Sequence, residues 1–344
     1  MVDYSDTNTG WNTIGHEWIV AALINHIQSG RIHHAYLFSG PPSIGKRTLA
    51  IDFAKSICCL EKQGHPCGNC RPCRLISNSK HPDVEEIAPR VSGKTIRQDK
   101  ISIDEIRNMI YRFTLNPIEL ERRIAIITNF ETASRLASDA MLKTLEEPPG
   151  DAVFIITIDN VSSLPETILS RCISFDLRSL PVSLVQQALI KHWGVQNQEA
   201  SFLARISGGR LGWAVTLMLD KETLDDRSIK LSQMISLLSQ SRVNRFSYVD
   251  TLRKDREQVV VALSLWECWW RDVMVVSSGT TNYAITNIDY QSEIQTVASK
   301  VDSIKAANTI SAIRNTQDKL RKNANVRLAL EVLMLQIPKL QLGH

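Results

Sequence analysis

The first half of the chain alternates short apolar runs with longer segments of helical periodicity. Three runs predict buried strands, at Ala35–Ser39, 123–127 and Val153–Ile158. Between them, apolar side chains recur every three or four residues over 46–59 and 135–147, as in helices that cover a sheet. Strands that alternate with helices predict an α/β domain, in which a parallel sheet is covered on both faces.

From residue 181 onward the strand pattern disappears and the chain reads as helical. We expect a short helical bundle to about residue 219 and longer amphipathic helices from there to 342. The acidic stretch 220–226 is a plausible junction between the two. A length of 344 residues also exceeds the usual size of one compact core, so we expect two or three domains.

Composition narrows the class of protein only a little. The net charge of +4 is too small to indicate nucleic acid as a partner by itself. No apolar run reaches the roughly 20 residues of a membrane span. Residues 1–11 are polar and acidic, unlike the basic and then apolar order of a signal peptide. We therefore expect a cytoplasmic protein with reduced thiols.

A phosphate-binding loop follows the first predicted strand. Gly40-Pro-Pro-Ser-Ile-Gly45-Lys46 has the G-x-x-x-x-G-K spacing and leads directly into a predicted helix. The two glycines allow tight turns, and Lys46 would reach the outer phosphates of a nucleotide. The next residue should carry the hydroxyl that holds Mg²⁺, but it is Arg47, and Thr48 comes one position late. A site at Gly40, Gly45, Lys46 and Thr48 is therefore degenerate, and a tight turn that binds nothing is the alternative.

The second predicted strand of an ATPase should end in acidic residues that hold Mg²⁺ and orient water. Here strand 123–127 is followed by Thr128 and Asn129, neither of which is charged. We interpret Glu131, slightly further on, as a solvated residue at the start of a helix. Both parts of a magnesium site are thus altered, and we expect no ATP hydrolysis by this chain.

Five of the seven cysteines fall within sixteen residues: Cys58, Cys59, Cys67, Cys70 and Cys73. In a reducing compartment such a cluster indicates metal rather than disulfides. Four thiolates at this spacing can surround Zn²⁺ in a closed, structural site. Helical phase does not separate Cys58 from its neighbour Cys59 as the first ligand.

Other interpretations of the cysteine cluster remain open. An iron–sulfur site would need a further cysteine four positions after Cys73, where the chain has Ser77. His65 and His81 are possible substitute ligands, and thiols that hold no metal are a further alternative. The two isolated cysteines, Cys172 and Cys268, are expected to be small buried hydrophobic residues.

The helical half contains a group of tryptophans and a group of basic residues. Trp266, Trp269 and Trp270 share one face of a predicted helix, and we expect them to pack in a helical core or against a neighbour. Several basic residues near the end of the chain could face DNA, although a solvated helix face is the simpler interpretation. They are Arg314, Lys319, Arg321 and Lys322.

Two segments resemble the bacterial clamp-loader ATPase family of DNA polymerase III, whose members load a sliding clamp onto primed DNA. They are Met141-Leu-Lys-Thr-Leu-Glu-Glu-Pro-Pro149 and Leu164-Pro-Glu-Thr-Ile-Leu-Ser-Arg-Cys172. The resemblance is specific from about residue 15 to 172 and looser beyond. It implies an AAA+ domain at 1–178 with a zinc module at 58–73, a helical lid at 179–222, and a helical collar at 223–344.

Within this family, the chain departs from the hydrolysing tau/gamma pattern. That pattern has Thr at position 47, Asp at 128 and Glu at 129, where this chain has Arg47, Thr128 and Asn129. In the lid, family ATPases carry an arginine at the position of Gly212, whereas the arginine here, Arg210, lies two residues earlier. The departures favour the non-hydrolysing delta-prime branch of the family.

The resemblance also implies roles for individual residues. Arg171 of the Ser170-Arg171-Cys172 turn would reach in trans into the ATP site of a neighbouring subunit and contact its γ-phosphate. A guanidinium suits this task because it binds phosphate oxygens in a fork and stays charged, whereas a lone arginine is otherwise commonly a surface ion-pair partner. Family spacing selects Cys58 over Cys59 as the first of four zinc ligands, with Cys67, Cys70 and Cys73.

The implied partners are tau/gamma and delta subunits in a hetero-pentamer, with the sliding clamp and primed DNA bound through the complex. Whether the altered loop still binds ATP is left open. Two other functions are considered: an ATP-hydrolysing tau/gamma-type subunit, and a free-standing zinc-containing protein that binds nucleic acid.

Overall fold

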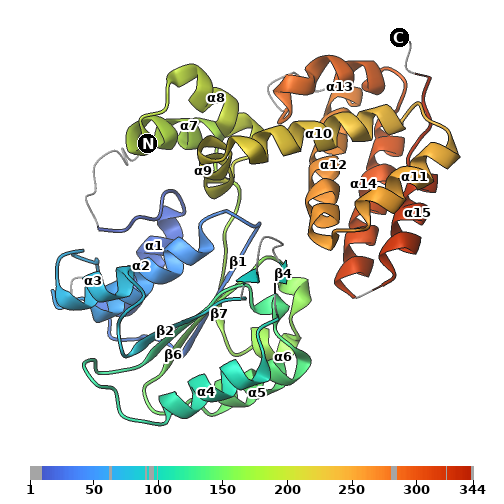
Figure 1. Ribbon diagram of the computed structural model, residues 1–344. Helices are drawn as coiled ribbons and strands as arrows, with labels where there is room; N and C mark the ends of the chain where they lie inside the picture. Colours follow the sequence, from blue (N-terminus) through green and yellow to red (C-terminus); the bar gives the residue numbers. More distant parts are fainter. Residues whose placement is uncertain are drawn as a thin grey trace. The chain divides into compact units, whose positions relative to one another are not determined.

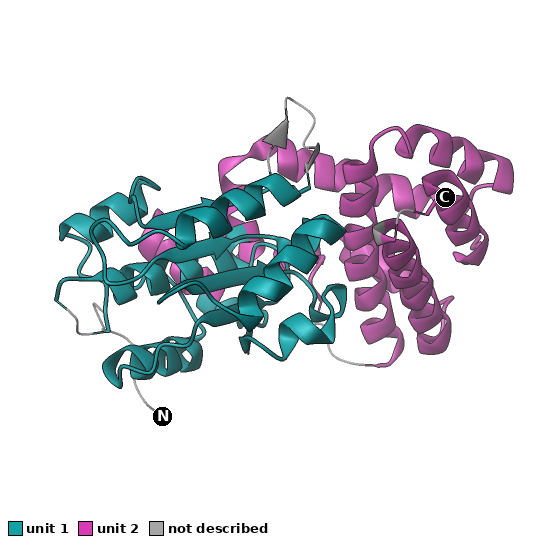
Figure 2. Cartoon of the chain, turned by 90° about the horizontal axis from the view of Figure 1, so that it is seen from below, with its two compact units in different colours: residues 1–184, 210–212 teal, residues 185–209, 213–344 magenta. Residues whose placement is uncertain are grey.

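The chain forms two compact units, one with residues 1–184 and 210–212 and the other with 185–209 and 213–344 (Figure 2). The computed structural model describes residues 10–61, 64–89, 91–92, 97–98, 100–279, 285–322 and 324–341. The polar start of the chain, 1–11, lies almost entirely outside these residues. The division between lid and collar at residues 222 and 223 remains a prediction.

Within the described residues of the first unit, five parallel strands form one sheet in the order β2-β5-β6-β1-β7. Their bounds are β1 Ala35–Ser39, β2 Val84–Ile87, β5 Ile124–Ile127, β6 Val153–Ile158 and β7 Ile173–Asp176. A short antiparallel ribbon pairs β3 Val91–Ser92 with β4 Arg97–Gln98. A sheet of parallel strands in the first unit confirms the predicted α/β class of this part of the chain.

Helices cover both faces of the sheet (Figure 1). Tyr36 and Phe38 of β1 pack toward one helical layer, and Ala35 and Leu37 pack toward the other, because successive strand residues point to opposite faces. The first layer contains α1 Glu17–Gln28, α2 Lys46–Cys58 and α3 Arg71–Ser77, and the second contains α4 Ile103–Phe113, α5 Arg135–Glu146 and α6 Glu166–Leu169. Two short 3-10 turns, Phe130–Thr132 and Val161–Ser163, follow β5 and β6.

The described residues of the second unit form helices and their connections. In chain order these are α7 Val182–Trp193, whose first residues belong to the first unit, α8 Asn197–Ile206, α9 Leu211–Leu219, α10 Lys221–Leu237, α11 Arg242–Leu252, α12 Arg256–Ser277, a 3-10 turn Ile288–Tyr290, α13 Gln291–Ala298, α14 Ser303–Arg321 and α15 Val326–Gln336. Among the helices described, none combines the length and the apolar character needed to cross a membrane.

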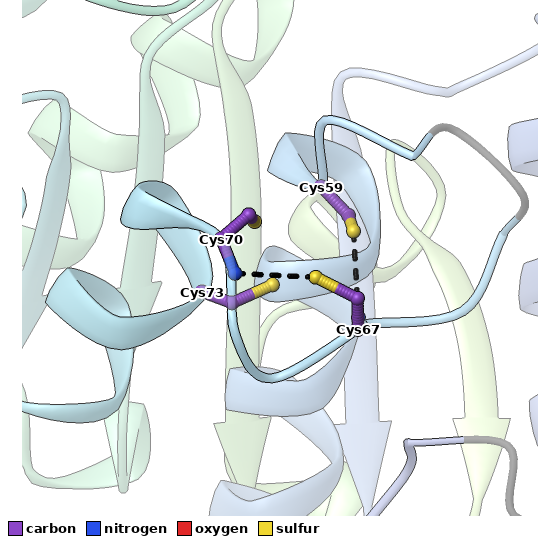
Figure 3. Close-up of side chains that lie close together, drawn as sticks. All are labelled: Cys59, Cys67, Cys70 and Cys73. Atoms are coloured by element: carbon purple, nitrogen blue, oxygen red, sulfur yellow. Dashed lines mark hydrogen bonds between the residues drawn. The ribbon is translucent and has the colours of Figure 1, made fainter.

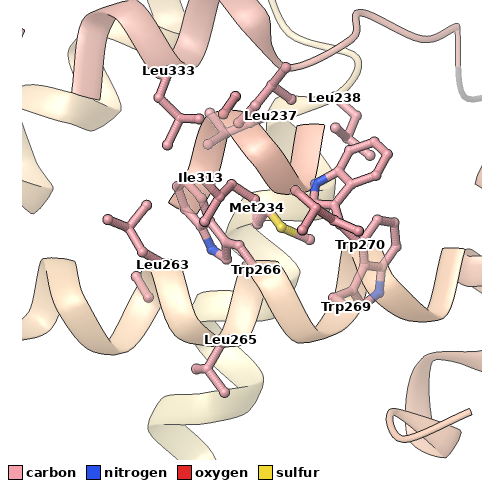
Figure 4. Packing of buried hydrophobic residues seen from close by; sticks show 14 of the residues in the cluster. Met234, Leu237, Leu238, Leu263, Leu265, Trp266, Trp269, Trp270, Ile313 and Leu333 are labelled. Carbon is pink, nitrogen blue, oxygen red and sulfur yellow. The ribbon is translucent and has the colours of Figure 1, made fainter. Parts of the chain in front are cut away.

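The three tryptophans of α12 lie in the core of this helical unit, as expected (Figure 4). Trp266, Trp269 and Trp270 are each fully buried, and the rings of the last two meet edge to face at 5.4 Å. They pack with side chains from α10, α14 and α15, among them Met234, Ile313 and Leu333. The cluster therefore joins helices that are far apart in the sequence into one core.

Two other sequence features of this half have simple structural explanations. The acidic stretch 220–226 forms the N-cap and the first turns of α10, where the Asp220 carboxylate accepts hydrogen bonds from the backbone N–H groups of Glu222 and Thr223. Arg314 and Lys319 are exposed on α14, and Arg314 pairs with Glu267 at 2.6 Å. Lys322 is also exposed, and the side chain of Arg321 lies outside what the structure describes.

A buried arginine joins two helix ends in the second unit. Arg245 of α11 is only 4% exposed, and its guanidinium donates to carbonyl oxygens 2.8–3.3 Å away. These oxygens belong to Leu237, Leu238, Met334, Ile337 and Pro338, at the ends of α10 and α15. The last carbonyls of a helix lack partners within the helix and carry partial negative charge, so the cation satisfies both ends at once.

Replacement of this arginine should destabilise the second unit. We expect Arg245→Ala to lower the free energy of unfolding by about 3 kcal/mol or more, because several buried carbonyl groups lose their donor. The free energy of unfolding is measured by urea titration with tryptophan fluorescence as the signal, since three tryptophans lie in the same core. Arg253→Ala is the matched control at the end of the same helix. Arg253 pairs with Asp250 at the surface, and its loss should cost about 1 kcal/mol or less. Equal effects of the two substitutions would contradict this role.

Candidate functional site

The phosphate loop has the backbone that its glycines permit. Gly40 has φ 146°, and a Cβ there would lie 2.4 Å from the carbonyl oxygen of Leu177, so only glycine fits. Gly45 has φ 111° and precedes Lys46, the first residue of α2. The loop therefore joins β1 to the N-terminus of α2, as the motif predicts.

Both cations of the loop are paired with acids of the same chain. Lys46 is 6% exposed, and its ammonium donates to the carbonyl oxygens of Gly40 and Pro41 at 2.6 and 2.8 Å. Its third partner is Oδ1 of Asp159, at 2.8 Å. Arg47 makes a two-pronged contact of 2.5 and 2.8 Å with the carboxylate of Glu86 on β2.

The other side chains at the positions of a magnesium site do not form one. Thr48 is exposed on α2. Thr128 is buried, and its N–H and hydroxyl donate to the carbonyl oxygen of Ile87 at 2.8 and 3.4 Å. Asn129 adopts a left-handed conformation with φ 53°. No carboxylate therefore stands at the end of β5, where a hydrolysing ATPase of this fold would hold its metal.

The prediction that Glu131 is solvated is wrong. Its side chain is half-buried, and one carboxylate oxygen is fully buried without a hydrogen-bond partner among the described residues. Burial, and then the negative charge of Asp159, raise the pKa of this carboxyl above its usual range. The turn after β5 directs the side chain inward, which the polar sequence around it does not indicate.

Asp159 is a site residue that the sequence interpretation missed. In the parallel pairing of β1 with β6, Ser39 lies opposite Ile158, so the next residues, Gly40 and Asp159, leave the same edge of the sheet. An acid directly after the third predicted strand was the available signal. Its meaning depended on knowing that these two strands are neighbours.

Four cysteine sulfurs converge beside the end of α2 (Figure 3). The Sγ atoms of Cys59, Cys67, Cys70 and Cys73 all lie within 4.8 Å of one another. A tetrahedral zinc ion with Zn–S bonds of about 2.3 Å needs sulfurs roughly 3.8 Å apart, so the group is compact enough to hold a metal ion. Neither His65 nor His81 belongs to this group.

The prediction of Cys58 as the first member of the group is wrong, and Cys59 takes its place. Cys58 is the last residue of α2, and its side chain is buried in the apolar layer between α2 and the sheet. Burial raises the pKa of this thiol to about 12. Cys59 has left the helix with extended backbone angles, which direct its sulfur toward the other three.

Backbone geometry supports the remaining sulfurs. The N–H of Cys67 donates to Sγ of Cys59 at 3.4 Å, and the N–H of Cys70 donates to Sγ of Cys67 at 3.3 Å (Figure 3). Cys70 caps α3, and Cys73 lies in the first turn of that helix. Burial opposes ionisation of Cys70, but hydrogen bonds from the N–H groups of Leu60 and Cys73 outweigh it and lower its pKa to about 7. The backbone around Cys70 therefore favours its thiolate, the form of the side chain that binds a metal ion.

Arg171 lies at an open pocket of the first unit. The pocket has a volume of about 690 Å³ and is lined by His33, His34, Leu145, Glu146, Glu147, Ser170, Arg171, Cys172 and Ile173. The guanidinium is one-third exposed and contacts the carboxylate of Glu146 at 2.7 Å and the carbonyl oxygen of Thr167 at 2.7 Å. It is thus an ion-pair partner within its own chain and is also accessible from solvent.

The two isolated cysteines are less buried than expected. Cys172 packs against the sheet core but remains partly exposed at the pocket, and burial raises its pKa to about 12. Cys268 is also partly exposed, and its sulfur accepts a hydrogen bond from the side-chain amide of Asn287. Neither lies in the four-cysteine group.

Two family models match the chain. The one described as "DNA polymerase III, delta subunit" matches residues 15–181, and the one described as "DNA polymerase III, delta subunit, C terminal" matches residues 221–339. DNA polymerase III subunit delta' of Bacillus subtilis is 28% identical over 324 residues, which cover 92% of this chain and 95% of that protein. The similarity therefore runs through nearly the whole of both chains.

Longer relatives match about two thirds of the chain. DNA polymerase III subunit tau/gamma of Haemophilus influenzae is 30% identical over 236 residues, or 66% of this chain and 33% of that protein. Subunit tau of Escherichia coli is 32% identical over 212 residues, or 60% of this chain and 32% of that protein. The aligned part thus spans about a third of the length of these two relatives.

The position of the sulfurs leads to a prediction that separates two adjacent cysteines. Cys59→Ser should abolish stoichiometric metal binding, because it removes one of four converging ligands. Cys58→Ser should retain about one equivalent of metal, as a closed four-ligand site does. Elemental analysis of protein purified without added metal measures both. The reverse pattern, with metal lost only in Cys58→Ser, would show that the sulfur positions are misassigned.

Proposed function

Because the chain belongs to the clamp-loader subunits of DNA polymerase III and is of the delta-prime type, we propose that it is a clamp-loader subunit that does not hydrolyse ATP. In this proposal it is a stator that supplies Arg171 in trans to the ATP site of a tau/gamma neighbour while the sliding clamp is loaded onto primed DNA. The absence of a usable magnesium site, combined with an accessible arginine at a separate pocket, is the observation that carries the proposal.

The residues at three positions support the proposed loss of ATP hydrolysis. Arg47 occupies the position of the Mg²⁺ ligand and is bound to Glu86. Thr128 and Asn129 stand where the fold needs acids, and the Thr128 hydroxyl donates to a backbone carbonyl. Magnesium that bridges the phosphates is required for phosphoryl transfer in this class of enzyme. Side-chain rotation alone cannot recreate the site, because the required chemical groups are missing.

The role of Arg171 in trans is supported by how it is held. Its contacts with Glu146 and the Thr167 carbonyl hold the guanidinium near the surface. Both partners of the ion pair are partly exposed, and such pairs are worth about 1 kcal/mol or less. A phosphate on a neighbouring subunit, which carries more negative charge and accepts two parallel hydrogen bonds, can therefore displace Glu146.

For the cysteine group we propose zinc with a structural role. All four positions around the ion would be filled by Cys59, Cys67, Cys70 and Cys73, so no position is left for water or substrate. Ser77 stands four positions after Cys73, where the ferredoxin type of iron–sulfur site has a cysteine, and this argues against that type of site. Elemental analysis that finds iron in place of zinc would remove this part of the proposal.

The proposed partners are tau/gamma and delta subunits in a hetero-pentamer, with clamp and primed DNA bound through the complex. The proposed organisation is an AAA+ domain, a lid at about 179–222 and a collar that joins the subunits. A tau/gamma-type ATPase is disfavoured by the missing acids. A free-standing nucleic-acid-binding protein is disfavoured by similarity to a delta' subunit along nearly the whole chain.

The isolated chain should release no phosphate from ATP in a steady-state assay at high protein concentration. Asn129→Glu should not restore turnover, because Arg47 and Thr128 still leave the metal without ligands. A tau/gamma preparation serves as the positive control. Turnover at a comparable rate that disappears in Lys46→Ala would contradict the proposal.

Arg171→Ala should impair a loader reconstituted with tau/gamma and delta subunits. Arginines that act in trans contribute about 10³–10⁵ in rate at the site they serve. One of several ATP sites borders this subunit in the proposed pentamer, so total ATP turnover should fall in part and clamp loading should fall further. Arg171→Lys should recover little, because an ammonium cannot form the two-pronged contact.

Arg178→Ala is the matched control for this experiment. Arg178 lies in the same unit and is highly exposed beside Asp176. Its replacement should leave turnover and loading unchanged, and gel filtration should show full assembly for all variants. Full activity of a correctly assembled Arg171→Ala loader would leave the chain as a stator only.

A further inference from the structure

The phosphate loop already contains an anion that the chain itself supplies. We infer that Asp159 occupies the phosphate-binding position of this loop as a built-in substitute and so keeps the loop closed to nucleotide. The inference deepens the proposed function, since a non-hydrolysing subunit could still bind ATP and this one would not.

The ammonium of Lys46 has no remaining donor for a phosphate. It carries three N–H groups, and its three acceptors, the carbonyls of Gly40 and Pro41 and the carboxylate of Asp159, lie 2.6–2.8 Å away. Its 6% exposure leaves little room for water to take over any of these contacts. A phosphate must therefore displace one of these acceptors before it can contact Lys46, and Asp159 is the one that carries a negative charge and repels it.

The sheet holds Asp159 in this position. Asp159 directly follows β6, and Gly40 directly follows β1, at a point where Ser39 and Ile158 are paired in parallel. Five consecutive residue pairs of the two strands, from Ala35–Phe154 to Ser39–Ile158, fix that register. The carboxylate is consequently attached to the same rigid element as the loop and is present at a high local concentration.

Two further features make the loop unfavourable for a nucleotide. The Glu131 carboxyl lies close enough to Asp159 for their charges to interact, so an incoming phosphate meets two acids. On the other side, a Cβ at Gly212 would lie 2.7 Å from the carbonyl oxygen of Ser43 in the loop. No side chain fits at position 212, so an arginine there could not reach a phosphate without moving the loop.

The test is a gain of binding in the isolated chain. Asp159→Asn keeps the size of the side chain and removes its charge. We expect it to bind ADP at least about tenfold more tightly than the wild type, because a repulsive charge a few ångströms from the phosphates is gone. Isothermal titration calorimetry with ADP, with and without Mg²⁺, measures the dissociation constants. Inorganic pyrophosphate as a second probe should show the same change, since the effect lies at the phosphates.

Two controls make the result specific. Asp176→Asn makes the same substitution at the end of β7, where the carboxylate accepts from the Ser39 hydroxyl, and should not improve binding. Lys46→Ala combined with Asp159→Asn should lose the gain, because Lys46 is the group released. If Asp159→Asn does not fold, as judged by circular dichroism, Asp159→Ser is measured in its place.

An unchanged dissociation constant in a folded Asp159 variant overturns the inference, and so does a gain that survives Lys46→Ala. Wild-type binding as tight as that of the variant also overturns it. The proposed function is tested separately by assembly and ATP turnover of the loader. A loader that assembles and depends on Arg171 would therefore stand even if Asp159 proved not to close the loop.

Discussion

The structure of the first unit depends on the parallel pairing of β1 with β6. These strands lie side by side within the sheet, and their register brings the start of the phosphate loop and Asp159 to one edge. Hydrogen bonds between the two strands fix the position of Asp159 relative to the loop more rigidly than a connecting loop could. The same pairing puts alternate β1 residues into two separate apolar layers, so the register that forms the site also forms the core.

The amino-acid sequence predicted the two central strands, β1 and β6, because each is a continuous run of apolar residues. The strands at residues 35–39 and 153–158 are continuous apolar runs, and the structure has them at those bounds. The edge strands β2 and β7 were not predicted. Their sequences, VEEI and ISFD, are short and half polar, because one side of an edge strand is less covered. The resemblance, rather than periodicity, carried the fold assignment across them.

The residues of the candidate site could be predicted where a sequence motif names them. They could not be predicted where membership of the site depends on the direction in which a side chain points. The loop and three cysteines follow from spacing. The choice between Cys58 and Cys59 depends on the residue at which α2 ends, a boundary that sequence places only to within a few residues. Glu131 and Asp159 are ordinary acids in the sequence. Their importance arises from a turn that points one inward and a strand pairing that places the other beside Lys46.

One helix connects the loop with the cysteine group, and this has a consequence for biosynthesis. α2 begins at Lys46, and the group starts at the residue after its last turn, so both lie on one stiff segment of about 20 Å. During synthesis the last of the four cysteines, Cys73, emerges 86 residues before Asp159, the partner of Lys46. The metal proposed for the cysteine group would therefore hold the end of α2 while the strand that completes the loop does not yet exist.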